Sequence, residues 1–214
     1  TIGLDSMQGP VAANYLISQK PERVAVVHDK QQYGEGIATA VRDTLEEGGV
    51  EVAMFEGITA GAKDFSSLVT KLRQADVDYV YYGGYHPELG LILRQAQQAD
   101  LDATFMGPEG VGNKDINTIA GDAAEGLLVT LPPSFDEKDE NQELVQAFEE
   151  KGEDPSGPFV LTSYTAVQLI ADGIEAAEST DPFDVAEALR AGTFQTPIGT
   201  VEYDGKGDLE SFEF

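Results

Sequence analysis

The most informative stretch of the sequence is Phe105-Met106-Gly107-Pro108-Glu109-Gly110-Val111-Gly112-Asn113, a short apolar strand followed by a glycine-rich turn. The turn carries one carboxylate, Glu109, which we interpret as the anchor for a ligand's positive charge. Two aromatic turns upstream, which contain Tyr33 and Tyr85, also follow an apolar strand and precede a helical pattern. Because ligands of open α/β sheets bind outside the carboxyl ends of the strands, these three side chains are expected to face a common space.

Strand-like apolar runs alternate with helical patterns through the first 130 residues. The predicted strands lie at 23–28, 50–55, 78–82, 104–106 and 126–130. Between them, apolar residues recur at helical spacing. Strands that alternate with helices form right-handed βαβ units around a parallel sheet, for which we predict the order 2-1-3-4-5. Residues 1–130 are therefore expected to form one nearly complete ligand-binding lobe, a doubly wound α/β unit.

Residues 131–214 follow a different pattern. Pro132-Pro133-Ser134 and an acidic stretch open this part. Helices are predicted at 143–151 and 160–177, and after Asp181, which stands at an N-cap position before a proline. A hairpin is predicted within residues 200–214. These elements are too few to build a sheet, so this part is expected to be a partial second α/β lobe with helices and a hairpin.

The composition is globular, and its charge excludes some partners. Hydrophobic residues make up 41% of the 214 residues and charged residues 24%, which is ordinary for a folded domain. Acidic side chains number 39 against 13 basic ones, a formal net charge of −26. This charge repels phosphate backbones and anionic lipid surfaces, so we expect neither a nucleic-acid nor a peripheral membrane partner. Direct membrane insertion is not expected either, because no apolar run approaches the roughly 20 residues that span a bilayer. Adaptation to high salt and plain acidity both remain open as its explanation.

No constellation in the sequence predicts catalysis, a metal or a cofactor. The two histidines, His28 and His86, lack tetrahedral ligand spacing, and cysteine is absent. Residues 34–36 fail as a dinucleotide fingerprint because Thr39 stands where a small residue is needed. Residues 204–208 fit a hairpin turn better than a calcium loop. A nucleophile elbow is also missing, so an enzyme of doubly wound fold is a weak alternative.

Each candidate binding residue has a structural alternative. A glutamate after Gly-Pro is commonly a solvated turn residue, and tyrosines at the end of a strand commonly pack at the rim of the sheet. For Glu109, Tyr33 and Tyr85, the shared position beyond neighbouring strands favours the binding interpretation.

Several longer motifs resemble those of the periplasmic leucine/isoleucine/valine-binding proteins, the solute receptors of branched-chain amino-acid ABC transporters. The matching motifs are residues 29–36, 81–85, 105–113, 119–126, 154–159, 197–199 and 205–209. The likeness runs over essentially the whole chain.

The resemblance implies a type I periplasmic binding fold, in which two α/β lobes close on an amino acid. In that family Glu109 would receive the ligand's α-ammonium group, and Tyr33 and Tyr85 would line the pocket from the same lobe. Phe159 would approach from the other lobe. The family's N-terminal part, with the serine and threonine turns that receive the α-carboxylate, is missing from this sequence, and so is the C-terminal tail. A fragment is therefore expected.

The resemblance also implies a function. We expect a periplasmic solute-binding protein that recognises leucine, isoleucine or valine and delivers it to the membrane permease of an ABC importer, without enzymatic activity. One alternative has the same fold but another role. In this alternative the chain is the ligand-sensing domain of a receptor or of an amide- or amino-acid-responsive regulator. A transmembrane or DNA-binding segment outside this sequence would favour that alternative.

Overall fold

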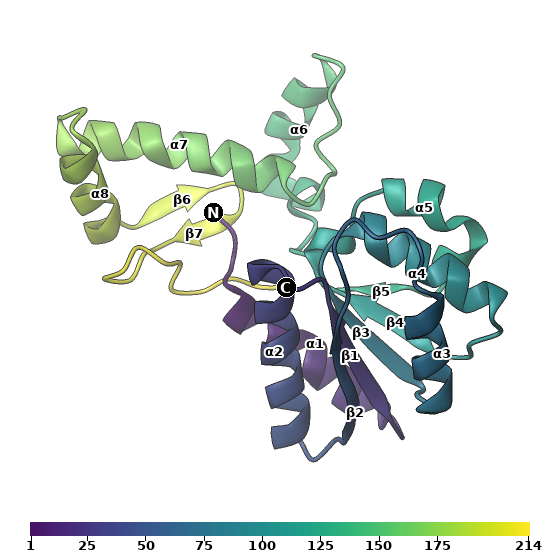
Figure 1. Ribbon diagram of the computed structural model, residues 1–214. Coiled ribbons are helices and arrows are strands. Elements are labelled where there is room, and N and C mark those ends of the chain that lie inside the picture. The colour runs from purple at the N-terminus through teal and green to yellow at the C-terminus, as the bar shows by residue number, and fades with distance from the viewer. The chain divides into compact units, whose positions relative to one another are not determined.

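The computed structural model describes every residue from Thr1 to Phe214 (Figure 1). The chain divides into two compact units. We call residues Asp5–Leu131 the sheet unit, and residues Thr1–Leu4 together with Pro132–Phe214 the C-terminal unit. None of the helices is both long enough and apolar enough to cross a bilayer.

A five-stranded parallel sheet forms the centre of the sheet unit. Its strands are β1 (Val24–His28), β2 (Val52–Gly57), β3 (Tyr79–Gly83), β4 (Thr104–Gly107) and β5 (Leu128–Val129). Their order is β2-β1-β3-β4-β5, and every neighbouring pair is parallel. The predicted α/β class and strand order are therefore confirmed. The central strands read as continuous apolar runs because both faces of a parallel sheet are covered.

Helices cover both faces of this sheet (Figure 1). One face carries α1 (Asp5–Gln19) and α2 (Gln32–Glu47), and the other carries α3 (Ser66–Gln74), α4 (His86–Gln98) and α5 (Asp115–Ala120). Successive strand residues point to opposite faces. Accordingly, Tyr81 is buried in the core under α1 and α2, and Tyr82 in the core under α3 and α4.

A close backbone approach fixes the start of α2 over the end of β3. A Cβ atom on Gly83 would lie 2.2 Å from the Gly34 carbonyl oxygen, and one on Gly34 would lie 2.6 Å from the Gly83 carbonyl oxygen. Only glycine permits this approach from both sides. The Asp29 backbone N–H also donates to the Gly83 carbonyl at 3.1 Å. The first turn of α2 is thereby held at the carboxyl edge of the sheet.

The C-terminal unit is built from helices and short strands. In chain order it contains η3 (Phe135–Glu137), η4 (Asp139–Asn141), α6 (Gln142–Glu149), α7 (Val160–Ala177), α8 (Pro182–Ala191), β6 (Phe194–Thr196) and β7 (Gly199–Val201). The α8 helix begins as predicted, because the Asp181 carboxylate accepts from the Phe183 backbone N–H at 2.8 Å. The buried Asn141 amide donates to the Phe135 carbonyl at 2.7 Å and to the Pro197 carbonyl at 2.8 Å. This side chain therefore ties the hairpin to η3.

The predicted hairpin turn at residues 204–208 is present, and a second hairpin that was not predicted precedes it. The antiparallel pair is β6 with β7, joined through Pro197 and Ile198, and Gly199 takes a φ of 109°. Residues 204–208 form the predicted turn, in which the Asp204 carboxylate accepts from backbone N–H groups. The flanking segments are antiparallel, with a bridge between Tyr203 and Leu209 and a hydrogen bond from the Glu210 N–H to the Glu202 carbonyl at 3.1 Å, so the pairing stops short of the predicted residues 212–214. The sequence pattern did not predict the hairpin of β6 and β7 because each of these strands has three residues. Three residues are too few to show the alternation of apolar and polar side chains.

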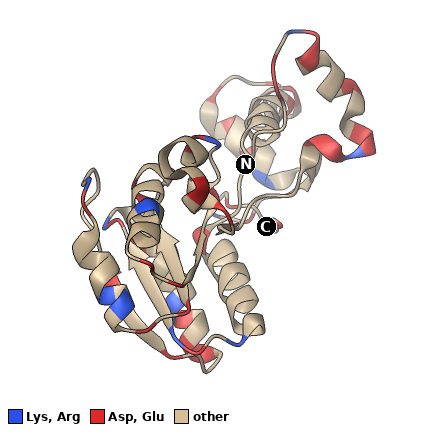
Figure 2. Cartoon of the chain, turned by 90° about the vertical axis from the view of Figure 1, so that its right-hand side faces the viewer, with Lys and Arg blue, Asp and Glu red and all other residues tan.

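Acidic side chains are spread over the surface of each unit, and basic ones are sparse (Figure 2). Two salt bridges, Arg42–Asp43 and Lys71–Glu56, lie at the surface of the sheet unit, and the 39 acidic side chains outnumber the 13 basic ones threefold. Most carboxylates therefore have no basic partner, and none of these ion pairs involves Glu109.

Candidate ligand-binding site

Three of the four predicted binding residues come together at the carboxyl edge of the sheet. Tyr33 lies in the first turn of α2, after β1, and Tyr85 lies directly before α4, after β3. Glu109 is the first residue of the short helix η1 (Glu109–Val111), after β4. These three strands are neighbours in the sheet, so segments far apart in sequence meet at one place.

Direct contacts join these three side chains. The Tyr33 hydroxyl donates to Oε1 of Glu109 at 3.2 Å, and the rings of Tyr33 and Tyr85 are 5.3 Å apart at an interplanar angle of 40°. A Cβ atom on Gly110 would lie 3.1 Å from the Tyr33 ring, so the glycine after Glu109 leaves room for that ring. Tyr85 is 48% exposed, whereas Tyr33 and Glu109 are half-buried. The carboxylate thus lies behind two rings, the outer one open to solvent.

The electrostatics of Glu109 suit it to a cationic ligand. Burial raises the pKa of its carboxyl, and the charge of Asp5 adds to this rise. Hydrogen bonds from the protein, including those of Gln8 and Tyr33, oppose it. Its second oxygen, Oε2, is buried and has no hydrogen-bond partner within the protein. A half-buried carboxylate without a basic partner carries a desolvation cost that a bound cation would offset.

The structure adds residues that the sequence pattern did not single out. Gln8 in α1 is 1% exposed, and its Nε2 donates to the Thr130 carbonyl at 3.2 Å. The Tyr81 hydroxyl is fully buried, and the charges of Tyr33, Glu109 and Asp5 all raise its pKa, after the larger effect of burial. One sequence signal was available: Gln8 stands four and eight residues before Ala12 and Leu16, which makes it a polar residue in an apolar helical stripe.

Phe159, the fourth predicted residue, belongs to the C-terminal unit. It directly precedes α7, and its side chain is 45% exposed. Its role in binding stays a prediction.

His28 serves a structural purpose. Its ring is 5.0 Å from that of Phe55, and Nδ1 accepts from the Lys30 backbone N–H at 3.3 Å. Burial lowers its pKa. These contacts give His28 a structural role at the end of β1. The other histidine, His86, begins α4.

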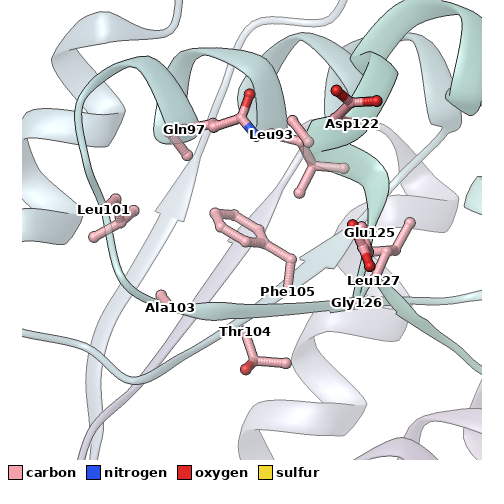
Figure 3. A pocket seen from close by; sticks show the side chains of 12 residues that line it. Leu93, Gln97, Leu101, Ala103, Thr104, Phe105, Asp122, Glu125, Gly126 and Leu127 are labelled. Carbon is pink, nitrogen blue, oxygen red and sulfur yellow. The ribbon is translucent and has the colours of Figure 1, made fainter.

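A separate cavity of about 230 Å³ lies at the opposite end of β4 (Figure 3). It is bounded by α4, the start of β4 and the short helix η2 (Gly121–Ala124), and Figure 3 shows the Phe105 ring rising from the strand toward Leu93 and Gln97. None of the predicted binding residues lines it. The candidate site is therefore the edge at Glu109.

Comparison with known proteins gives relatives over the full length of the chain. A leucine-, isoleucine-, valine-, threonine-, and alanine-binding protein of Pseudomonas aeruginosa is 60% identical over 215 residues, and the Leu/Ile/Val-binding protein of Escherichia coli is 53% identical. Each alignment covers 100% of this chain and 58% of the relative. The chain therefore spans less than two thirds of the length of these curated relatives.

Solved structures show the same fold. The crystal structure of a leucine binding protein from Thermotoga maritima matches with a TM-score of 0.86 and 27% identity, over 96% of this chain and 60% of that one. A branched-chain amino acid transporter substrate binding protein from Streptococcus pneumoniae, crystallised with isoleucine, matches with a TM-score of 0.81 and 22% identity, over 99% and 65%. The second likeness is evidence of fold alone.

The sequence model of the periplasmic binding protein family matches residues 1–208. This match spans the sheet, the three turns at its carboxyl edge and most of the C-terminal unit. The chain belongs to the periplasmic binding protein family.

Proposed function

We propose that the sheet unit receives the ammonium group of an aliphatic amino acid at Glu109, as the ligand-binding lobe of a solute receptor. The observation that carries this proposal is the half-buried Glu109 carboxylate, which Tyr33 orients through the 3.2 Å hydrogen bond and which has one oxygen unpartnered. A hydrogen bond to a charged group contributes about 1.5–3 kcal/mol, so one such carboxylate can fix the orientation of a small zwitterion.

The two tyrosine rings support an aliphatic cation rather than a polar or anionic ligand. Tyr33 and Tyr85 present ring surface beside the carboxylate, which favours both an ammonium group and apolar carbon atoms. The formal charge of −26 and the charge of Asp5 near Glu109 oppose an anion. Both curated relatives are named for leucine, isoleucine and valine, and the Pseudomonas aeruginosa protein also for threonine and alanine, which supports small aliphatic amino acids, the branched-chain ones first, as the ligand class.

The assignment of the two parts of the chain belongs to the same proposal. Residues 1–130 would be the nearly complete ligand-binding lobe, and residues 131–214 part of a second lobe that brings Phe159 to the ligand. Exposed apolar side chains on α7, with Val167 70% and Ile170 54% exposed, support a larger lobe in the complete protein. Ligand would then bias a hinge between open and closed states.

The cellular role follows from the ligand class. We propose a non-enzymatic receptor in the periplasm that passes the amino acid to the permease of an ABC importer. The names of the relatives, which are those of binding proteins, support this role. Selectivity among leucine, isoleucine and valine would be modest, because one methylene in an apolar pocket changes the free energy by only about 1–3 kcal/mol.

Titration calorimetry with L-leucine, L-isoleucine and L-valine tests the function, on a form of the protein that spans the full length of its relatives. The wild type and Glu46→Gln, a matched change at an exposed position of α2, should bind leucine equally. Glu109→Gln should bind it at least about tenfold more weakly, because the ammonium loses its charged partner. Equal affinity of Glu109→Gln and wild type would refute the role of Glu109.

A further inference from the structure

A layer of buried polar groups lies behind Glu109, on the face of the sheet covered by α1 and α2. Thr130 directly follows β5 and lies two residues after Leu128, whose side chain packs on this face, so the alternation of a strand points Thr130 to the same face. The side chain of Tyr81 in β3 also points to this face. Gln8 enters from the first turns of α1. Each of these three side chains, and Glu109 itself, has one buried polar atom without a hydrogen-bond partner within the protein.

The orientation of the Gln8 amide is fixed by its neighbour. The Thr130 carbonyl can only accept, so the nitrogen Nε2 must face it, at the observed 3.2 Å. That nitrogen has a second hydrogen to donate. The anchor itself lies beside the turn that carries Glu109, because the Thr130 backbone N–H donates to the Gly107 carbonyl at 3.1 Å, two residues before Glu109. The lowering effect of Gln8 on the pKa of Glu109 agrees with this placement.

The position of Gln8 is otherwise unfavourable for a polar residue. It belongs to the buried stripe of α1 with Ala12 and Leu16, both fully buried, and it keeps an unpartnered oxygen. An apolar side chain of the same length would avoid this desolvation. The bond to the Thr130 carbonyl uses one of the two amide hydrogens, and a contact with Glu109 would use the second.

We propose that Gln8 is a positioning residue for Glu109: anchored on the Thr130 carbonyl, its amide donates its second hydrogen toward the Oε2 side of the carboxylate. The inference rests on the proposed binding role of Glu109. Tyr33 holds Oε1 from the α2 side, and Gln8 holds the carboxylate from the α1 side. The two contacts together hold the Glu109 carboxylate in one orientation at the carboxyl edge of the sheet, where the ligand's ammonium group would bind.

The pH dependence of binding distinguishes this role from a structural one. The titratable groups that face Glu109 are Asp5 from α1, Tyr33 from α2 and Tyr81 from β3. Tyr33 and Tyr81 both have raised pKa values, so they remain neutral donors. Asp5, whose own pKa is raised by burial, opposes ionisation of Glu109. Removing the Gln8 donor should therefore move the loss of leucine affinity on acidification to a higher pH.

The experiment compares Gln8→Met with Gln98→Met, the same change at an exposed position of α4, by leucine calorimetry across pH in the full-length form. Gln8→Met should bind about tenfold more weakly at neutral pH and lose binding at a higher pH than the wild type, whereas Gln98→Met should match the wild type in both. Unchanged affinity and pH midpoint in Gln8→Met would overturn the proposal.

A second variant keeps the test decisive if Gln8→Met folds poorly. Gln8→Glu preserves size and polarity but sets a second carboxyl against Glu109, so its pH midpoint should move further upward. An unchanged midpoint in Gln8→Glu would contradict the proposal. A wrong proposal for the function itself gives different results. In that case the wild type does not bind leucine, or Glu109→Gln binds leucine as well as the wild type does.

Discussion

The Tyr33 hydroxyl donates to Oε1 of Glu109 at 3.2 Å across 76 positions of sequence. The parallel sheet creates this contact, because β1 and β4 flank β3 and their following turns open at the same edge. The hydrogen bond both orients the carboxylate and lowers its pKa against the larger effect of burial.

We expect Tyr33→Phe to weaken leucine binding by roughly three- to tenfold, since water can replace part of a charged hydrogen bond at a half-buried site. Loss of the donor also raises the pKa of Glu109 further, so the affinity should disappear at a higher pH as the solution is acidified. Calorimetry across pH measures both effects. Tyr85→Phe, which keeps the neighbouring ring, is the control, and an effect as large as that of Tyr33→Phe would contradict this account.

Glu109 should lower the stability of the ligand-free protein at neutral pH. Its pKa is raised by burial, so the folded protein holds this proton more tightly than the unfolded chain does. The cost is absent below the ordinary value of 4.5, where both states are protonated, and grows as the pH rises through the folded pKa. Glu109→Gln should therefore raise the melting temperature by a few degrees near neutral pH and change it little in acid.

Thermal unfolding of Glu109→Gln and of the exposed control Glu46→Gln, at acid and neutral pH, measures this effect. A Glu109→Gln variant that melts below the wild type at neutral pH would show that protein groups already stabilise the ionised carboxylate. Glu109 would then have no need of a ligand cation.

The glycine pair beneath Tyr33 gives a prediction about the scaffold. In Gly83→Ala the new Cβ would meet the Gly34 carbonyl at 2.2 Å, so α2 must shift. Overpacking of this kind costs about 1–3 kcal/mol, or more where backbone is displaced. Urea unfolding should show that loss, and leucine binding should weaken as Tyr33 moves. Gly205→Ala, with open space around its Cβ, should be neutral, and similar stability of the two variants would contradict the argument.

Sequence periodicity was sufficient to predict the strands and helices of the sheet unit. Continuous apolar strands and helical stripes predicted the βαβ alternation, and the order 2-1-3-4-5, taken from that fold class, placed Tyr33, Tyr85 and Glu109 at one edge. Periodicity places Gln8 in the apolar stripe of α1 with Ala12 and Leu16, but it does not show that Gln8 is buried, because a polar residue in the first turn of a helix is commonly solvated. It predicted the turn at residues 204–208 but missed the β6–β7 hairpin, which tertiary contacts such as those of Asn141 help to hold.

The 214-residue chain should bind leucine at least about a hundredfold more weakly than a form spanning the full length of its relatives. The site offers a carboxylate for the ammonium, but Glu109 and Asp5 repel the ligand's α-carboxylate, which needs partners elsewhere. The decarboxylated analogue 3-methylbutylamine lacks that group and should bind the two forms much more evenly. Calorimetry with both ligands tests this, and equal leucine affinity of the two forms would refute it.

Salt should stabilise the protein, because repulsion outweighs attraction among its charges. The formal charge is −26, while the two surface ion pairs contribute only about 0–1 kcal/mol each. The Debye length falls to about 8 Å at 0.15 M salt and about 3 Å at 1 M. Plain acidity thus predicts a melting temperature that rises at low salt and then levels off, whereas adaptation to high salt predicts a continued rise to molar NaCl. Sucrose at matched osmolality controls for solute exclusion, and a flat salt response would contradict both explanations.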